Sequence, residues 1–267
     1  MLTTTTLDQL TELGLSGMHR ALSEQMESAN ARELPFEDRL AMLLGRELQE
    51  RLNRKLQRNL KAAKLRVDAC MEDLDFRRPR GLDRSSVLAL ASAQWATARQ
   101  NILVVGPTGA GKTFLACALA QAAVRTGHTA LYLRAPRLLD DLTLARGDGR
   151  LPRILAAWAR VDVLVIDDLA LRPLSPAAAA DLLEVVEDRA GRRSTVVASQ
   201  LPVHDWHAAL GDPSLADAIL DRLAHNAHRL TLSGDSMRRR KPQEDAEIPK
   251  RVNTTGRRGA HTAVEAR

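Results

Sequence analysis

The stretch that decides the fold is Gly106-Pro107-Thr108-Gly109-Ala110-Gly111-Lys112-Thr113. Its spacing, G-x-x-x-x-G-K-T, is typical of a loop that binds phosphate groups. The apolar residues 102–105 before it resemble a buried parallel strand, and a helix-forming run starts at Phe114. A chance match in a glycine-containing turn would lack this context. The sequence therefore predicts an α/β fold built around a phosphate loop.

Each residue type in this loop has a physical role. The glycines let successive backbone N–H groups point at phosphate oxygens. The helix that begins near Lys112 directs the positive end of its dipole at the same anion. Lys112 adds a point charge at the outer phosphates, and the Thr113 hydroxyl can complete the coordination shell of Mg²⁺. We therefore expect residues 106–113 to bind ATP and Thr113 also to bind the metal.

A second apolar run, residues 161–166, ends in the two carboxylates Asp167 and Asp168. Carboxylates at the C-terminal tip of a buried parallel strand lie beside the phosphate loop in open α/β sheets. We expect Asp167 to bind Mg²⁺, directly or through water, and Asp168 to orient or deprotonate the attacking water. The alternative is that the two acids cap the next helix, since helix starts favour aspartate.

Four apolar runs and one further short strand segment predict a five-stranded, mostly parallel sheet between helices. The four runs lie at 102–105, 130–133, 161–168 and 195–198, and the short segment lies at 229–232. One strand is expected between the phosphate-loop strand and the Asp167 strand, an order typical of ring-forming and helicase-like ATPases. Gln200 follows the fourth run, where a polar side chain can contact the γ-phosphate and the attacking water. Gln200 could equally begin an ordinary loop.

Residues 1–74 lack strand signals and form, by their leucine periodicity, a small helical module. A long helical stripe runs from Phe36 to Leu60, and its other face is rich in cations. We hypothesise that this face binds the DNA backbone, although most charge runs are only solvated surface. The candidate DNA-binding residues are Arg51, Arg54, Lys55, Arg58, Lys61 and Lys64. Residues 75–237 are expected to form the ATPase domain, with one helix over residues 82–99 that leads into the first strand, and residues 238–267 a basic, disordered tail.

Composition agrees with an anionic partner. The 267 residues include 39 Lys and Arg against 33 Asp and Glu, a net charge of +6. Nucleic acid is the usual partner of such a chain, although an arginine-rich composition alone gives the same balance. Two distant cysteines indicate neither a disulfide framework nor a zinc site. The sequence shows neither a signal peptide nor an apolar run of membrane-spanning length, so we expect a cytoplasmic protein.

Four longer strings resemble the IstB-like ATP-binding proteins, the helper ATPases of one bacterial insertion-sequence family, which is related to helicase loaders of the AAA+ class. These strings are GPTGAGKTFLACALA from Gly106, SQLPVHDWH from Ser199, GDPSLADAILDRLAHNAHRL from Gly211 and GDSMR from Gly234. The likeness extends over about residues 5–240. It implies an ATPase that uses ATP and Mg²⁺, assembles with copies of itself through ATP at subunit interfaces, and assists a transposase on duplex DNA until hydrolysis releases it.

The resemblance also implies roles for single residues. Arg222 corresponds to an arginine finger that reaches the ATP of a neighbouring subunit, whereas from the residues alone it looks like a surface salt-bridge residue. Arg238 is implied to be a sensor on the nucleotide, and Gln200 occupies a sensor position where many relatives carry Asn. Many AAA+ proteins have Asp-Glu where this chain has Asp167-Asp168. The shorter second carboxylate could slow hydrolysis and leave ATP mainly as an assembly signal.

Three other functions stay open at this point. A replicative helicase loader would share the ATPase domain but bind a helicase and single-stranded DNA. Single-strand binding usually adds aromatic stacking platforms, and the chain has one Tyr and three Phe. A small-molecule phosphotransferase would need a substrate pocket and a lid, for which the sequence offers no candidate. A passive, ATP-gated scaffold would bind ATP without turning it over.

Overall fold

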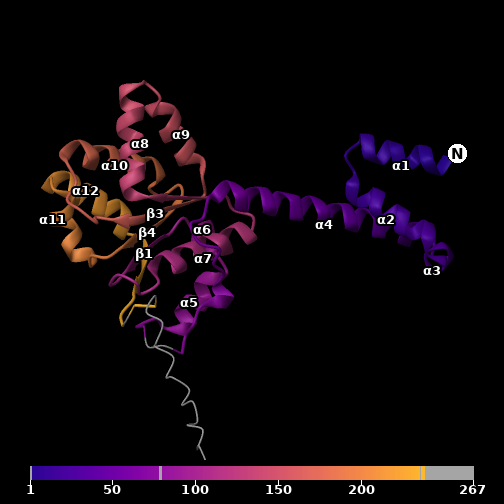
Figure 1. The fold of residues 1–267 in the computed structure, drawn as a ribbon, viewed down its shortest axis with the longest axis horizontal. Coiled ribbons are helices and arrows are strands. Elements are labelled where there is room, and N and C mark those ends of the chain that lie inside the picture. Colours follow the sequence, from indigo (N-terminus) through magenta and orange to yellow (C-terminus); the bar gives the residue numbers. More distant parts are fainter. Residues whose placement is uncertain (1, 78–79, 235, 238–267) are drawn as a thin grey trace, which may run out of the picture.

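The computed structural model describes residues 2–77, 80–234 and 236–237. An α/β domain and a helical arm make up this part of the chain (Figure 1). The arm consists of α1 (Leu2–Glu12), α2 (Ser16–Glu27), α3 (Ala29–Glu33) and α4 (Phe36–Ala63). In Figure 1 the long helix α4 extends from the α/β domain and carries the three shorter helices at its far end.

The α/β domain is organised around one parallel sheet. Its strands are β1 (Asn101–Val105), β2 (Ala130–Arg134), β3 (Val163–Leu169), β4 (Ser194–Ser199) and β5 (Ala227–Thr231). Their order in the sheet is β2-β3-β4-β1-β5, and every neighbouring pair is parallel. β1 and β4 are buried along their whole length, as central strands of a parallel sheet covered on both faces usually are. The predicted fold is confirmed, including the strand between β1 and β3.

Helices cover both faces of the sheet. On one face α7 (Lys112–Arg125) packs with η1 (Met71–Asp73), α5 (Arg84–Ala91), α6 (Gln94–Thr97) and the end of α4 around one apolar cluster. The other face is covered by α8 (Ala135–Gly147), α9 (Leu151–Arg160), α10 (Pro176–Arg189), η2 (Val203–Asp205), α11 (Trp206–Leu210) and α12 (Pro213–Ala224). Because the sheet is covered on both sides, its C-terminal edge remains as the place where polar side chains can gather.

One predicted helix is divided in the structure. Residues 82–99 were expected to form a single helix, but α5 and α6 are separated by Ala93, whose φ of 55° is left-handed. The turn brings Trp95 into the core, where its indole N–H donates to the carbonyl of Leu90 at 3.0 Å. Burial of this large side chain outweighs the local preference of the sequence for a continuous helix.

The arm is held together by Glu47. Its carboxylate accepts hydrogen bonds from the backbone N–H groups of Gly17 and Met18 and from Arg51. Gly17 is needed there because a Cβ would come within 2.6 Å of the Glu47 backbone. The hydrogen bond from Arg51 holds the pKa of the Glu47 carboxyl below its usual range. A buried charge with these partners fixes α2 against α4.

The leucine stripe of α4 has two different environments. Leu56 and Leu60 pack against the core cluster of the α/β domain. Most earlier members are exposed: Leu48 and Leu52 are 63% and 61% exposed, and Phe36, Leu40 and Leu44 are exposed as well, whereas Leu43 is half-buried. The arm therefore joins the α/β core before residue 75, and the boundary expected there stays a prediction. The tail expected over 238–267 lies outside the described residues. None of the described helices is long and apolar enough to cross a membrane.

Candidate functional site

The phosphate loop connects β1 to α7, as the sequence predicts. Gly106, Gly109 and Gly111 have φ values of 148°, 85° and 100°, which other residues rarely adopt. Two of them are also enclosed: a Cβ at Gly106 would collide with the Leu232 carbonyl, and one at Gly109 with the Ser236 side chain. The chain after β5 thus lies against the loop, so these glycines satisfy a packing requirement as well as a conformational one.

Lys112 lies inside the loop that it terminates. Its side chain is buried, with 7% of the residue exposed, and Nζ donates to the carbonyl of Pro107 at 2.8 Å. A buried ammonium group is costly unless polar partners surround it, and the curled loop supplies one. Together with the N-terminus of α7, this charge makes the loop a fitting cradle for a polyphosphate.

Thr113 and Asp167 meet at the base of the loop. The Thr113 hydroxyl donates to Asp167 Oδ2 at 2.8 Å, and the Tyr132 hydroxyl donates to the same oxygen at 2.6 Å. The other oxygen, Oδ1, accepts the backbone N–H of Asp168 at 2.9 Å. Asp167 is 1% exposed, so these protein groups fix its carboxylate. Burial and the Asp167 carboxylate both raise the pKa of Tyr132 above its usual range.

Asp168 is held differently from its neighbour. Its backbone is left-handed, with φ of 59°, and the pairing of β3 with β4 is irregular between Ile166 and Leu169. Its Oδ2 accepts a hydrogen bond from Arg134 Nε at 3.0 Å and forms a salt bridge with Arg134 Nη2 at 2.9 Å. Neither acid caps the next helix, since Ser175 caps α10 by accepting the N–H of Ala178. The irregularity coincides with Asp168, whose side chain is 17% exposed, against 1% for that of Asp167.

Sequence reasoning missed three residues around the carboxylates. Tyr132 and Arg134 belong to β2, whose Arg134 pairs in register with Asp167. Arg66 follows α4 and lies 4.0 Å from Asp167 and 3.8 Å from Asp168. A hydrogen bond with Tyr132 raises the pKa of the Arg66 guanidinium. The position of Arg134 at the tip of a neighbouring strand was readable from the sequence, whereas that of Arg66 depends on how α4 docks.

Gln200 and Arg222 lie at opposite ends of the strands. Gln200 follows β4 beside the phosphate loop, and its side-chain oxygen accepts the Thr108 hydroxyl at 2.7 Å. The Arg222 carbonyl accepts the side chain of Asn101, the first residue of β1. Asn101 is separated from the phosphate loop by the length of β1, about 13 Å at the usual strand rise. The Arg222 side chain instead pairs with Glu187 at 2.6 Å and Asp221 at 3.0 Å.

The remaining candidates differ in how well they are placed. All six cations proposed for DNA binding are exposed. Arg51 and Arg54 share Glu47 as a partner, at 2.7 Å and 3.5 Å. Lys55, Arg58, Lys61 and Lys64 have no salt bridge to any described residue. Arg238 lies outside the residues that the structure describes.

The donor set also bears on the metal. In the described part of the chain, no group of three or more His, Cys, Asp or Glu side chains could hold a metal ion by itself. Mg²⁺ commonly takes one or two protein oxygens and completes its shell with phosphate oxygens and water. The Thr113 hydroxyl and the Asp167 carboxylate fit that role, because they share a hydrogen bond directly below the phosphate loop.

Three comparisons place the chain among known proteins. It is 49% identical over 239 residues to the "Putative insertion sequence ATP-binding protein y4pL" of Sinorhizobium fredii, covering 90% of this chain and 98% of that protein. It is 52% identical over 203 residues to the "Insertion sequence IS1162 putative ATP-binding protein" of Pseudomonas fluorescens, covering 76% and 88%. The fold resembles the crystal structure of the DnaC helicase loader with a TM-score of 0.55 at 19% identity, over 64% of this chain and 99% of that one.

The family model described as IstB-like ATP binding protein matches residues 8–245, which is nearly the whole chain. The match includes the phosphate loop, the two carboxylates and most of the arm. The chain therefore belongs to the family of IstB-like ATP-binding proteins.

Proposed function

We propose that this protein is an ATPase of the AAA+ class that binds duplex DNA, assembles on it with ATP and assists a transposase. The observation that carries the proposal is the hydrogen bond between Thr113 and Asp167 below a phosphate loop that already encloses Lys112. This arrangement supplies a metal-binding hydroxyl, a metal-binding carboxylate and a cation at one place. These are the groups that ATP hydrolysis in phosphate-loop enzymes requires.

The residues of the chain divide the work of the reaction. The loop and Lys112 would bind the phosphates, and Thr113 with Asp167 would hold Mg²⁺, which neutralises phosphate charge when bound. Asp168 would orient the attacking water and accept its proton. Gln200 accepts the Thr108 hydroxyl of the phosphate loop. From this position its side chain would contact the same water or the terminal phosphate. Catalysis here is mainly positioning and charge stabilisation, so fixed side chains are what the site must provide.

Arg222 supports assembly as part of the same reaction. Its position near the start of β1 keeps it away from the phosphate loop of its own subunit. Its present partners, Glu187 and Asp221, are mostly exposed, and such ion pairs are easily exchanged. We propose that in an oligomer Arg222 leaves them and contacts the ATP of the adjacent subunit. Hydrolysis would then loosen the interface and release the assembly.

Duplex DNA and a transposase are the proposed partners. Relatives at 49% and 52% identity are named after insertion sequences, and the basic face of α4 offers a row of exposed cations. Cations four residues apart on one helical face line up and suit a phosphate backbone. The alternative of a helicase loader has a likeness in fold to DnaC, but at 19% identity this likeness concerns the fold alone.

ATP binding and turnover test the proposal together. We expect Lys112→Ala to lose about 2–4 kcal/mol of ATP affinity, the scale of a charged phosphate contact. Filter retention of labelled ATP measures the loss, and an affinity near that of the wild type would contradict the site. Phosphate release with and without duplex DNA then separates the ATPase from a passive scaffold, which would bind ATP equally well but release no phosphate in either condition.

A further inference from the structure

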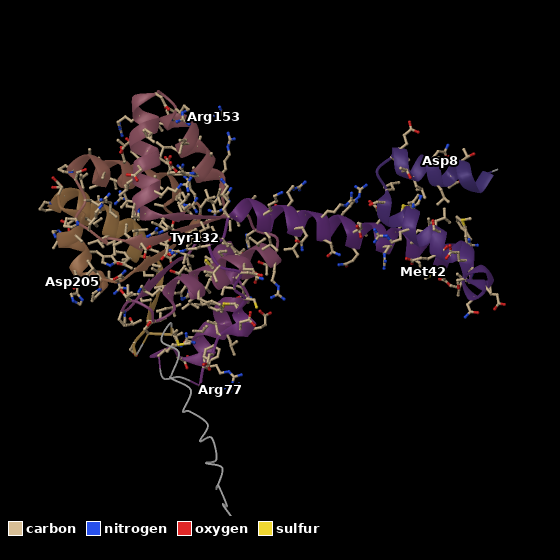
Figure 2. All side chains as sticks on the ribbon, viewed as in Figure 1. Asp8, Met42, Arg77, Tyr132, Arg153 and Asp205 are labelled. Carbon is tan, nitrogen blue, oxygen red and sulfur yellow. The ribbon has the colours of Figure 1, made fainter. Side chains whose placement is uncertain are left out.

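Arg66 connects the end of α4 to the two carboxylates at the tip of β3. It follows Ala63, the last residue of α4, by three positions. Its Nη1 lies 4.0 Å from Asp167 Oδ2 and 3.8 Å from Asp168 Oδ2. The backbone on both sides of Arg66 contacts the α/β core, because Ala63 is fully buried and Leu65 and Val67 pack against the cluster around α7. Figure 2 shows Tyr132, which contacts both Arg66 and Asp167, within the α/β domain.

The charges around the carboxylates balance only without a metal. Asp167 and Asp168 carry two negative charges, and Arg66 and Arg134 carry two positive ones. Arg134 makes hydrogen bonds of 2.9–3.0 Å, whereas Arg66 stays 3.8–4.0 Å away and its side chain is 42% exposed. A divalent cation on Asp167 adds two positive charges nearby. The resulting repulsion acts first on Arg66, since its contact is the longer and weaker one.

We propose that Arg66 is a positioning residue of the ATP site, which neutralises the Asp167–Asp168 pair, yields when a divalent cation binds there, and thereby couples metal binding to the end of α4. The proposal rests on the proposed function, because it takes residues 106–113 and Asp167 as the site of ATP and Mg²⁺. Coupling between two binding events is reciprocal. A partner that moves α4 would therefore change the affinity of the ATP site for Mg²⁺ by the same factor.

Two substitutions separate this coupling from simple electrostatics. Arg66→Gln removes the charge that follows α4. Arg134→Gln is the matched control. It removes an equal positive charge beside the Asp168 carboxylate, but residue 134 lies in β2 and not after α4. Arg66→Lys keeps the charge and tests whether charge is the property that matters. We expect both glutamine variants to bind Mg²⁺ about three- to tenfold more tightly, since a neighbouring like charge has gone. The gain in Mg²⁺ affinity should shrink in 0.5 M salt, because the two charges are then about one Debye length apart and interact less strongly than in dilute buffer.

Two readouts that do not depend on turnover test the variants. The first is the Mg²⁺ concentration that half-saturates binding of a fluorescent, non-hydrolysable ATP analogue. The second is hydrogen exchange of the backbone amides of residues 56–70, with the bound analogue and with or without Mg²⁺. In the wild type, in Arg134→Gln and in Arg66→Lys, we expect Mg²⁺ to change exchange in this segment. In Arg66→Gln that response should be lost although Mg²⁺ binds more tightly.

Three results would overturn the inference: an unchanged Mg²⁺ requirement in Arg66→Gln, an exchange response that persists in that variant, or a lysine variant that behaves like the glutamine one. Failure of the wild type to bind the analogue at any Mg²⁺ concentration is a different result, and it contradicts the ATP site itself. No DNA is needed in either readout. The outcome is thus independent of where DNA binds.

Discussion

Asp168 is the residue whose backbone conformation bears most directly on the proposed chemistry. Its left-handed backbone, with φ of 59°, is one that Asp and Asn adopt more readily than Glu does. In this conformation its carboxylate accepts a hydrogen bond from Arg134, at the tip of β2. A glutamate at this position would reach farther but would strain the backbone. The Asp-Asp pair therefore agrees with the local structure of the strand end as well as with the proposed need for a carboxylate that accepts a proton.

Substitutions at the two acids should separate metal binding from water activation. Asp168→Asn suits the left-handed backbone, so we expect it to retain ATP binding and to lose hydrolysis. Asp167→Asn should instead weaken the Mg²⁺ dependence of ATP binding, because it removes the buried carboxylate beside Thr113. Phosphate release and nucleotide affinity as a function of Mg²⁺ measure the two effects. Normal turnover in Asp168→Asn would mean that another residue positions the water.

Tyr132 allows a direct test of the buried carboxylate. It is the one tyrosine of the chain, so absorbance at 295 nm reports its ionisation alone. Burial and the Asp167 carboxylate raise its pKa. The folded state therefore holds the Tyr132 proton more tightly than the unfolded state does. The contribution of this proton to folding stability is complete below the ordinary tyrosine pKa of about 10. It is lost as the pH rises through the raised pKa of the folded state. We expect little phenolate signal at pH 10 while the protein stays folded. Half-ionisation near pH 10 in the folded protein would contradict the contact.

Among the elements, α4 exposes both leucines and cations, and only some of the cations are paired with a described residue. Leu48 and Leu52 are exposed beside cations of the same helix. Arg51 and Arg54 are partly neutralised by Glu47, whereas Lys55 and Arg58 are not paired with any described residue. Lys55 and Arg58 are therefore the better candidates for phosphate contacts, since binding DNA would not require breaking an existing ion pair.

A triple substitution tests the basic face of α4. Removing the charges of Arg54, Lys55 and Arg58 together should weaken duplex binding uniformly across DNA sequences. The slope of log affinity against log salt should also fall by about 0.9 for every phosphate that is no longer neutralised. Fluorescence anisotropy at several salt concentrations measures both quantities. If affinity and slope both persist, these cations are only solvated surface and the DNA site lies on the α/β domain.

The strands and the phosphate loop were predictable because strong local patterns define them. Apolar runs marked four of the strands, the short segment 229–232 indicated β5, and the glycine spacing marked the loop. The division of the predicted helix at Ala93 could not be read in this way, because it follows from the burial of Trp95 by distant residues. The contact of Arg66 with the carboxylates was likewise hidden, since it depends on the docking of α4 across β2 and α7.

At the scale of the whole molecule, the end of the arm meets the α/β domain beside the proposed ATP site, where Arg66 lies near Asp167 and Asp168. α4 extends the arm away from the sheet, and Met42 lies on the arm at a distance from the α/β domain in Figure 2. Arg222 lies at the opposite end of the strands from the phosphate loop. In the proposed oligomer, a subunit would present ATP at one end of the sheet and Arg222 for its neighbour at the other, an arrangement that would favour head-to-tail assembly.

Electron microscopy of the protein with ATP and duplex DNA tests the central claim, ATP-driven assembly on DNA, most directly. We expect particles of several subunits on the DNA when ATP is present. They should be absent without nucleotide and in Lys112→Ala, which lacks the phosphate contact. Single subunits in the presence of both ATP and DNA, or identical particles with and without nucleotide, would contradict the claim.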